Sequence, residues 1–396
     1  MLGAVLAGLL IWGAISSFFS MMLFVMIVGS SMSTEKAVSV SDDAVLKIDL
    51  SNIIGERSGS EYSLSYESLL AGKFSCLGLM DVDRALDNAA SDPKIKMVYL
   101  YFPGFAVQDQ ASVEAIRDMV MEFRENSGKP VVAFGYSFSN FDYYLASAAD
   151  SVFMRTMGDF SLCGLGSEQL YLKGALDKLG ITATVIRHGK FKSAVEPFLL
   201  DKMSDENREQ TLRYLNDFWD LIVSEISESR DIPVDTINAH VDSMDLYCNS
   251  DLCVSEGFLD GVLLESDFDS RVKSMLGLSS DDDDPQYISV SDYQKSIIPD
   301  TDPESRVAVI YADGEIAQEP GEGVFTSDEI GQAIRDAASD DNVKAVVLRV
   351  NSPGGVVVDA EIIYRELQKL KETGKPLVVS MGGYAASGGY WISSLA

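Results

Sequence analysis

A long apolar run opens the chain and predicts a membrane-spanning helix. The first charged residue is Glu35, and residues 2–28 are almost entirely apolar. As an α-helix this run is about 40 Å long, enough to cross a bilayer with some tilt. It is longer than the apolar core of a cleavable signal peptide and lacks a basic start. We therefore expect one N-terminal transmembrane anchor over residues 1–34. The orientation of this helix in the membrane remains open, because no flanking lysine or arginine decides it. A true start upstream of Met1 also remains open.

Beyond this run, strand-like and helix-like patterns alternate, and the same series occurs twice. Residues 85–104 (ALDNAASDPKIKMVYLYFPG) and 333–354 (AIRDAASDDNVKAVVLRVNSPG) both predict a helix, a short acidic turn and an apolar strand. Residues 111–135 and 359–382 continue the match with an amphipathic helix, a Gly-Lys-Pro stop and a second buried strand. Such alternation favours parallel sheets with right-handed crossovers. The sequence thus predicts an α/β protein with two tandem copies of one domain.

The repeat sets the expected domain boundaries. We expect the first domain at 45–265, an acidic linker at 266–305, and the second domain at 306–396. Ala396 corresponds to Ala149 of the first copy, which continues well beyond that point. We therefore expect the second domain to be truncated, and the chain to be inactive by itself.

Composition narrows the function classes. The net charge of −30 argues against binding to nucleic acid or to an anionic membrane surface. None of the four cysteines forms a CxxC pair, so the sequence gives little support for a metal site and we expect no cofactor. A disulfide between Cys248 and Cys253 is possible outside the cytoplasm, although nothing in the pattern requires it.

A candidate nucleophile, Ser387, lies in the segment GGYAASGGYW (382–391). Small neighbours allow a substrate backbone to approach a hydroxyl, although the same residues also suit a tight strand-to-helix turn. The equivalent position in the first copy is Asn140, in SFSNFDYY, where the glycines are also absent. A purely structural turn would be retained in both copies. The difference indicates that one copy carries chemistry and the other has become a scaffold.

A serine nucleophile needs a base. The chain has only two histidines, His188 and His240, and the latter lies in an ordinary amphipathic pattern. Lys192 lies in RHGKFKSAVEPF, after the strand-like segment ITATVI (181–186), and its apolar neighbours suit the desolvation that lowers a lysine pKa. Lys190 and Lys173 remain alternatives on chemistry alone.

Backbone donors for an oxyanion are expected in NSPGG (351–355), which follows an apolar strand. The alternative is a simple strand-end turn. The first copy has YFPGF there, so only the second glycine differs. This favours Gly355 over Gly354 as the donor, with both as candidates.

The motifs AASGGYW, RVNSPGG and FKSAVEPF, in this order on a duplicated domain, resemble the long, two-domain form of signal peptide peptidase A, also called protease IV. The resemblance covers nearly the whole chain, but not the missing C-terminal part or a basic start. It implies the Clp protease/crotonase fold, Ser387 as nucleophile and Lys192 as general base.

The resemblance also implies a biological setting. It implies a bacterial inner-membrane enzyme whose catalytic domains face the extracytoplasmic side. It further implies assembly as a homo-oligomer, a tetramer in the family, and substrates that are cleaved signal peptides and other short apolar peptides. Two other interpretations compete: a crotonase-like acyl-CoA hydratase or isomerase, and a membrane scaffold without catalysis. The membrane anchor and the Ser–Lys pair argue against the hydratase.

Overall fold

A computed structural model describes residues 39–396 except for five internal segments: 52–53, 59–75, 105–108, 279–283 and 298–303. The anchor expected at residues 1–34 lies outside the described residues. Among the helices that are described, none has the length and apolar character needed to cross a bilayer.

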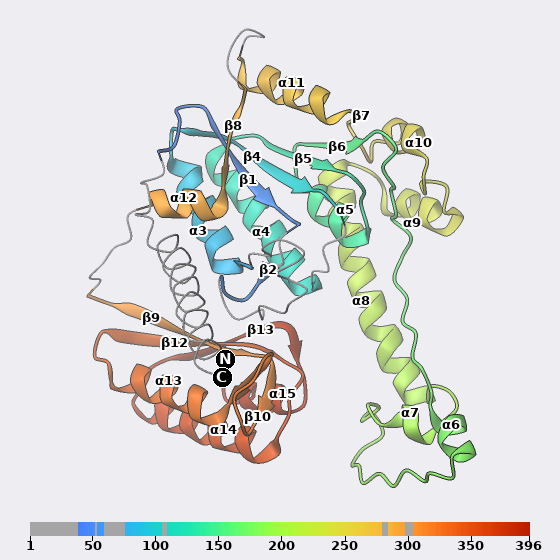
Figure 1. The fold of residues 1–396 in the computed structure, drawn as a ribbon, viewed down its shortest axis with the longest axis vertical. Helices are drawn as coiled ribbons and strands as arrows, with labels where there is room; N and C mark the ends of the chain where they lie inside the picture. The colour runs from blue at the N-terminus through green and yellow to red at the C-terminus, as the bar shows by residue number, and fades with distance from the viewer. Residues whose placement is uncertain (1–38, 52–53, 59–75, 105–108, 279–283, 298–303) are drawn as a thin grey trace, which may run out of the picture. The chain divides into compact units, whose positions relative to one another are not determined.

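The first repeat forms a six-stranded parallel sheet in the order β7-β6-β5-β4-β1-β8 (Figure 1). Its strands are β1 (Ala44–Asp49), β4 (Ile95–Phe102), β5 (Val131–Gly135), β6 (Ser151–Arg155), β7 (Gly261–Leu263) and β8 (Gln286–Ser289). The helices α3 (Leu79–Ser91), α4 (Gln110–Ser127) and α5 (Asn140–Ala146) connect them. All five residues of β5 are buried, as expected for a central parallel strand covered on both faces.

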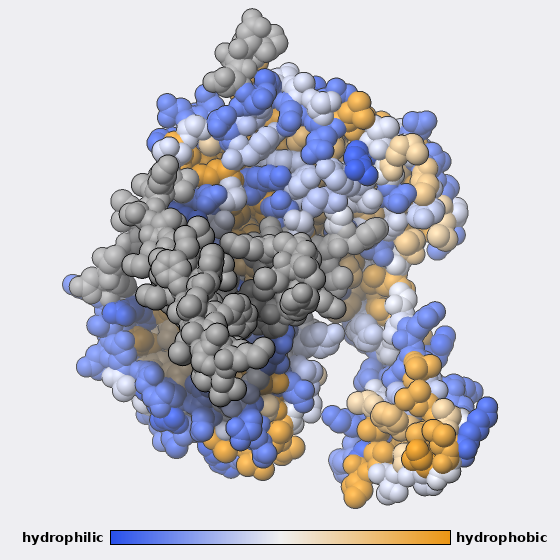
Figure 2. Space-filling model, in the orientation of Figure 1, coloured by the Kyte–Doolittle hydropathy of each residue, from blue (hydrophilic) through white to orange (hydrophobic). Residues whose placement is uncertain are grey.

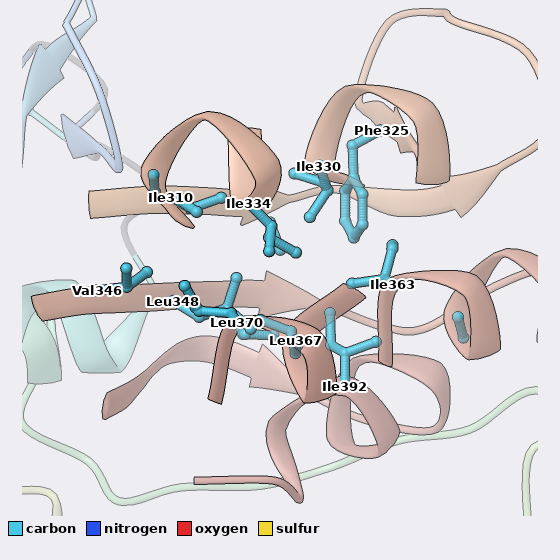
Figure 3. Packing of buried hydrophobic residues seen from close by; sticks show 14 of the residues in the cluster. Ile310, Phe325, Ile330, Ile334, Val346, Leu348, Ile363, Leu367, Leu370 and Ile392 are labelled. Atoms are coloured by element: carbon cyan, nitrogen blue, oxygen red, sulfur yellow. The ribbon is translucent and has the colours of Figure 1, made fainter. Parts of the chain in front are cut away.

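The second repeat forms a three-stranded parallel sheet in the order β13-β12-β9. It contains β9 (Arg306–Asp313), β12 (Val343–Ser352) and β13 (Leu377–Ala385), with helices α13 (Ser327–Ser339), α14 (Val357–Glu372) and α15 (Gly388–Ser393). Figure 3 shows Ile334 of α13 and Leu367 of α14 packed with Leu348 of β12 in the core of this repeat. The prediction of an α/β protein with parallel sheets is confirmed.

Two short ladders complete the strands. β10 (Glu315–Ala317) pairs with β11 (Val324–Thr326), and β2 (Ile54–Gly55) pairs with β3 (Leu77–Gly78). Both ladders are parallel.

The segment expected to be an acidic linker contains regular structure. It includes α11 (Glu265–Leu276), β8 and α12 (Val290–Ser296), and β8 pairs with β1 at the edge of the first sheet. Ile288, Val290 and Tyr293 are buried there. Because the segment is mainly acidic, these few apolar positions did not predict a strand or helix, yet their burial attaches the segment to the first repeat.

A helical arm leaves the first repeat. It comprises α6 (Lys173–Lys178), α7 (Glu196–Leu199) and α8 (Asp205–Arg230), followed by α9 (Val234–Ser243) and α10 (Ser250–Ser255). Figure 1 shows α6 and α7 beside the N-terminal end of α8. The strand expected at 181–186 does not form: this segment pairs with no strand in the described part of the chain, and Ile186 is 99% exposed. A β-branched pattern stabilises a strand only where a neighbour can pair with it.

The thiols of Cys248 and Cys253 are both free, so the possible disulfide between them is not formed.

Candidate active site

Ser387 occupies a strained turn between β13 and α15. Its backbone has φ 51° and ψ −115°, in a region that a non-glycine residue adopts only when its surroundings impose it. Such strand-to-helix turns expose the side chain of a nucleophilic serine. The Ser387 side chain is exposed and caps no N–H of α15. Its hydroxyl is therefore available for chemistry.

The glycines around the serine are required by close backbone packing. A Cβ added to Gly389 would lie 2.6 Å from the carbonyl oxygen of Ser352. A Cβ on Gly354 would lie 2.7 Å from Cβ of Ser387. The NSPGG turn and the serine turn thus touch directly, and neither tolerates a larger residue at these positions.

The structure brings Lys192 to Ser387. Nζ of Lys192 lies 3.5 Å from Oγ of Ser387, a long hydrogen bond, and both side chains are exposed. Catalytic hydrogen bonds are often long before substrate binds. The predicted nucleophile and the predicted base, which come from different repeats, therefore meet at one site.

The alternative bases have other partners. Lys173 binds Asp177 (2.9 Å), and this bond raises the pKa of Lys173, opposite to what a general base requires. Nζ of Lys190 lies 3.4 Å from Glu206. The His240 ring bonds Asp245 (2.8 Å) and packs edge-on against Phe258.

A buried carboxylate supports the loop that carries Lys192. The Arg187 guanidinium donates to the backbone oxygen of Lys192 (2.9 Å) and lies 3.8 Å from Glu196. Glu196 is fully buried and accepts hydrogen bonds from the backbone and hydroxyl of Ser204 and from the amide of Asn207. Burial alone would raise the pKa of Glu196, but the bonds from Ser204 and Asn207 and the nearby Arg187 lower it. Because Ser204 is the N-cap of α8, Glu196 ties the lysine loop to the start of that helix.

Sequence reasoning missed Arg187 and Glu196. The available signal was a single acidic residue inside the otherwise apolar segment AVEPF.

Two backbone N–H groups near Ser387, those of Gly355 and Gly388, have no acceptor among the described residues. Gly354 and Gly355 have φ of 100° and 152°. The Gly354 N–H donates to the Ser352 hydroxyl (3.2 Å), whereas the Gly355 N–H has no hydrogen-bond partner among the described residues. Gly388, the first residue of α15, has no intrahelical acceptor for its N–H. A Cβ on Gly388 would lie 3.4 Å from the Gly355 nitrogen, so the two residues are close neighbours.

Gly388 was not among the donors predicted from the sequence. A donor directly after the nucleophile is usual where a strained turn opens a helix, and this signal was present in the motif.

The first repeat also braces the strand that leads to Ser387. Glu56 is 4% exposed and makes a bidentate ion pair with Arg349 of β12, at 2.7 and 3.0 Å. The same guanidinium donates to the Ser380 hydroxyl and to the Met381 carbonyl of β13, each at 2.9 Å. A Cβ on Gly382 would lie 2.7 Å from the Glu56 carboxylate, which explains the glycine there.

Within the described residues, no group of three or more His, Cys, Asp or Glu side chains is arranged to hold a metal ion.

Comparison with known proteins identifies relatives. Residues 124–261 match Peptidase family S49. Protease 4 of Haemophilus influenzae is 34% identical over 391 residues, which cover 95% of this chain and 63% of that protein. Protease 4 of Salmonella typhi is 35% identical over 361 residues, covering 88% of this chain and 58% of that protein. The chloroplastic serine protease SPPA of Arabidopsis thaliana is 28% identical over 334 residues, with 81% and 48% coverage.

The chain thus spans about 60% of the length of the two bacterial relatives. An enoyl-CoA hydrotase/isomerase family protein from Silicibacter pomeroyi shares 14% identity over 50% of this chain and 69% of its own, with a TM-score of 0.29, too low to support an inference. The two Protease 4 relatives and the match of residues 124–261 to Peptidase family S49 confirm the resemblance inferred from the AASGGYW, RVNSPGG and FKSAVEPF motifs.

Proposed function

We propose that this protein is a serine endopeptidase with a Ser–Lys dyad. One observation carries the proposal: a serine in a strained, exposed turn lies 3.5 Å from a lysine of the other repeat. A neutral amine beside a hydroxyl is an established way to activate a serine.

The proposed reaction uses four groups. The neutral Lys192 amine takes the proton of the Ser387 hydroxyl while Oγ attacks the peptide carbonyl carbon. The N–H groups of Gly355 and Gly388 stabilise the negative oxygen of the tetrahedral intermediate. Lys192 then gives the proton to the departing amine. A water molecule then attacks the acyl carbon while the neutral Lys192 amine takes its proton. The bond between the acyl carbon and Oγ breaks, Lys192 returns the proton to Oγ of Ser387, and the carboxylic acid product leaves.

We further propose that substrates are short apolar peptides, including cleaved signal peptides. The apolar run at residues 2–28 supports this, because a membrane anchor would hold the site near peptides left in a bilayer. The bacterial inner membrane, with the catalytic repeats on the extracytoplasmic side, is the proposed location. Two of the relatives carry the name Protease 4, which supports the reaction class.

A homo-oligomer is part of the proposal. Figure 2 shows apolar side chains gathered over α6, α7 and the adjoining end of α8. The exposed members beside the lysine loop are Leu179, Ile186, Phe191 and Phe198. Large exposed apolar patches usually mark interaction surfaces. A second copy on this patch would also shield Lys192, and desolvation favours the neutral amine that a base requires.

The test is cleavage of an apolar signal-peptide sequence by the full-length protein in detergent. We expect Ser387→Ala and Lys192→Ala each to lower kcat/KM at least about 10³-fold. Ser394→Ala, which removes an exposed serine at the end of the same helix, and Lys190→Ala serve as matched controls and should remain within about 3-fold of wild type. Cleavage by Ser387→Ala at the wild-type rate would refute the proposal.

A further inference from the structure

The strand that precedes the NSPGG turn is two residues longer than its counterpart in the first repeat. β4 has 8 residues and β12 has 10. Both begin with the same register shift against the neighbouring strand, at Ile95 and at Val343. Both end directly before a Pro-Gly pair. The additional residues therefore lie at the carboxyl end of β12 and are Asn351 and Ser352.

Asn351 fills an interruption in the ladder between β12 and β13. Val350 pairs with Met381 and Ser352 pairs with Ala385, so three residues of β13 lie opposite Asn351 alone. Oδ1 of Asn351 accepts the Tyr384 N–H at 3.0 Å. The Asn351 side chain thus replaces the missing backbone acceptor for the N–H of Tyr384, which lies three residues before Ser387. Such bulges commonly redirect a side chain beside an active site.

Ser352 makes the next contact along β13. Its carbonyl oxygen accepts the Ala386 N–H (3.0 Å), and its buried hydroxyl accepts the Gly354 N–H. The two additional residues thus hold both the serine turn and the glycine turn.

Asp313 fixes the orientation of the Asn351 amide. Nδ2 of Asn351 donates to Oδ1 of Asp313 at the end of β9 (3.0 Å). A carboxylate accepts and cannot donate, so this bond turns the amide oxygen toward Tyr384. The Asn351 carbonyl also accepts the Gly314 N–H (2.9 Å). One residue therefore joins the carboxyl ends of all three strands of the second sheet.

We propose that Asn351, oriented by Asp313, is a positioning residue that sets the turn carrying Ser387. Its effect on catalysis rests on the proposed function. Asn351 touches no reacting atom. It acts through Tyr384, Ala385 and Ala386, which lead into the strained backbone at Ser387. Without it the Tyr384 N–H loses its acceptor and the bulge loses its register.

A reciprocal exchange of the two side chains tests the proposal. In Asn351→Asp, two carboxylates face each other, so the bond between positions 351 and 313 is lost. In Asn351→Asp with Asp313→Asn, the amide and the carboxylate trade places. The amide introduced at position 313 donates to the carboxylate introduced at position 351, whose second oxygen accepts the Tyr384 N–H. All the hydrogen bonds are then restored, with the bond between the two side chains reversed in direction.

The readouts are the rate of Ser387 labelling by a fluorophosphonate in the full-length protein, and kcat and KM for an apolar peptide. We expect N351D to slow labelling about 100-fold. Peptide cleavage should fall mainly through a lower kcat and not through a higher KM, because displacement of a nucleophile impairs the chemical step more than substrate binding. The double variant should recover to within about 5-fold of wild type, since the coupled pair is restored. Asn342→Asp, the same substitution at an exposed site before β12, should have no effect.

A second readout does not depend on activity. Hydrogen exchange of the Tyr384 amide should be slow in wild type, at least about 10-fold faster in N351D, and slow again in the double variant. If the wild-type protein showed no peptide cleavage and no labelling, the proposed function would be refuted, but hydrogen exchange of the Tyr384 amide would still test the positioning role of Asn351. An unfolded N351D beside a folded, active double variant would also support the coupling. Wild-type labelling in N351D, or a double variant no better than N351D, would overturn the positioning role.

Discussion

The two repeats build the same strand-to-helix turn in opposite ways. In the first, Ser139 has ordinary extended backbone (φ −80°, ψ 179°) and forms a capping box with Asp142. Asn140, which the sequence repeat aligns with Ser387 and which is the first residue of α5, donates to the Gly164 carbonyl (2.7 Å) and accepts the Cys163 N–H (2.9 Å). In the second, Ser387 is strained and caps nothing. The first turn uses its polar side chains to bind its own backbone, whereas the second leaves a hydroxyl exposed.

The difference between the two turns indicates that they have different roles. The first turn needs no strain because its residues only stabilise local structure. The strain of the second turn is maintained by contacts from outside it, including Glu56 on Arg349 and Asn351 on Tyr384. Strain that persists only through such contacts is characteristic of functional sites. The first repeat instead contributes Lys192, carried on its arm.

The largest expected difference between the turns concerns Ser387 and Asn140. We expect Ser387→Ala to reduce peptide cleavage at least about 10³-fold. Asn140→Ala should leave kcat within about 3-fold, yet lower the free energy of unfolding by about 1–2 kcal/mol because two hydrogen bonds are lost. Steady-state kinetics and thermal unfolding of the two variants measure both effects. A catalytic collapse of folded Asn140→Ala would mean that the first turn also carries chemistry.

The next largest effect concerns the glycine turns. Gly354→Ala forces a Cβ to 2.7 Å from Cβ of Ser387 and from the nitrogen of Gly388, at a backbone φ of 100°. Because this displaces the serine and the proposed donor Gly388 together, we expect cleavage to fall about 10²–10³-fold. Gly104→Ala is the matched control, because no described atom lies within 4 Å of its added Cβ. Equal rates for these two variants would show that the second turn is no more constrained than the first.

A smaller effect is expected at the arm. Glu196→Gln keeps the shape but removes the charge, so we expect kcat to fall about 10-fold and unfolding free energy to fall by about 1–3 kcal/mol near neutral pH. Because the pKa of Glu196 is lowered on folding, its stabilisation is present above the unfolded carboxyl pKa of about 4.3. It is lost as the pH falls through the lowered value.

The difference in melting temperature between wild type and Glu196→Gln should therefore be largest above about pH 5 and disappear in stronger acid. Glu209→Gln, on exposed α8, is the control. A difference that grows as the pH falls would contradict the assigned direction.

The fold was largely predictable because it depends on periodic burial. The parallel sheets follow from the repeated strand and helix patterns. The prediction of a strand at 181–186 was wrong because a strand also requires a neighbouring strand to pair with. β8 was missed because a few apolar residues lie in an acidic segment.

The site was predictable in part. Comparison of the repeats singled out Ser387. The family resemblance of the FKSAVEPF motif singled out Lys192, which chemistry alone did not separate from Lys190 and Lys173. Glu196, Gly388 and Asn351 were missed because their roles depend on burial, backbone direction and strand register, which appear only when distant segments pack together. The two-residue difference between the repeats was visible in the sequence, yet only the pairing of β12 shows which residues are additional.

The account's central claim is that Lys192 of the first repeat activates Ser387 of the second. The most direct measurement is fluorophosphonate labelling of the full-length protein in detergent, with the adduct located by peptide mass spectrometry. We predict an adduct on Ser387 whose rate of formation rises with pH, falls at least about 100-fold in Lys192→Ala, and is unchanged in His188→Ala. An adduct on another serine, or Ser387 labelling at the wild-type rate in Lys192→Ala, would contradict the claim.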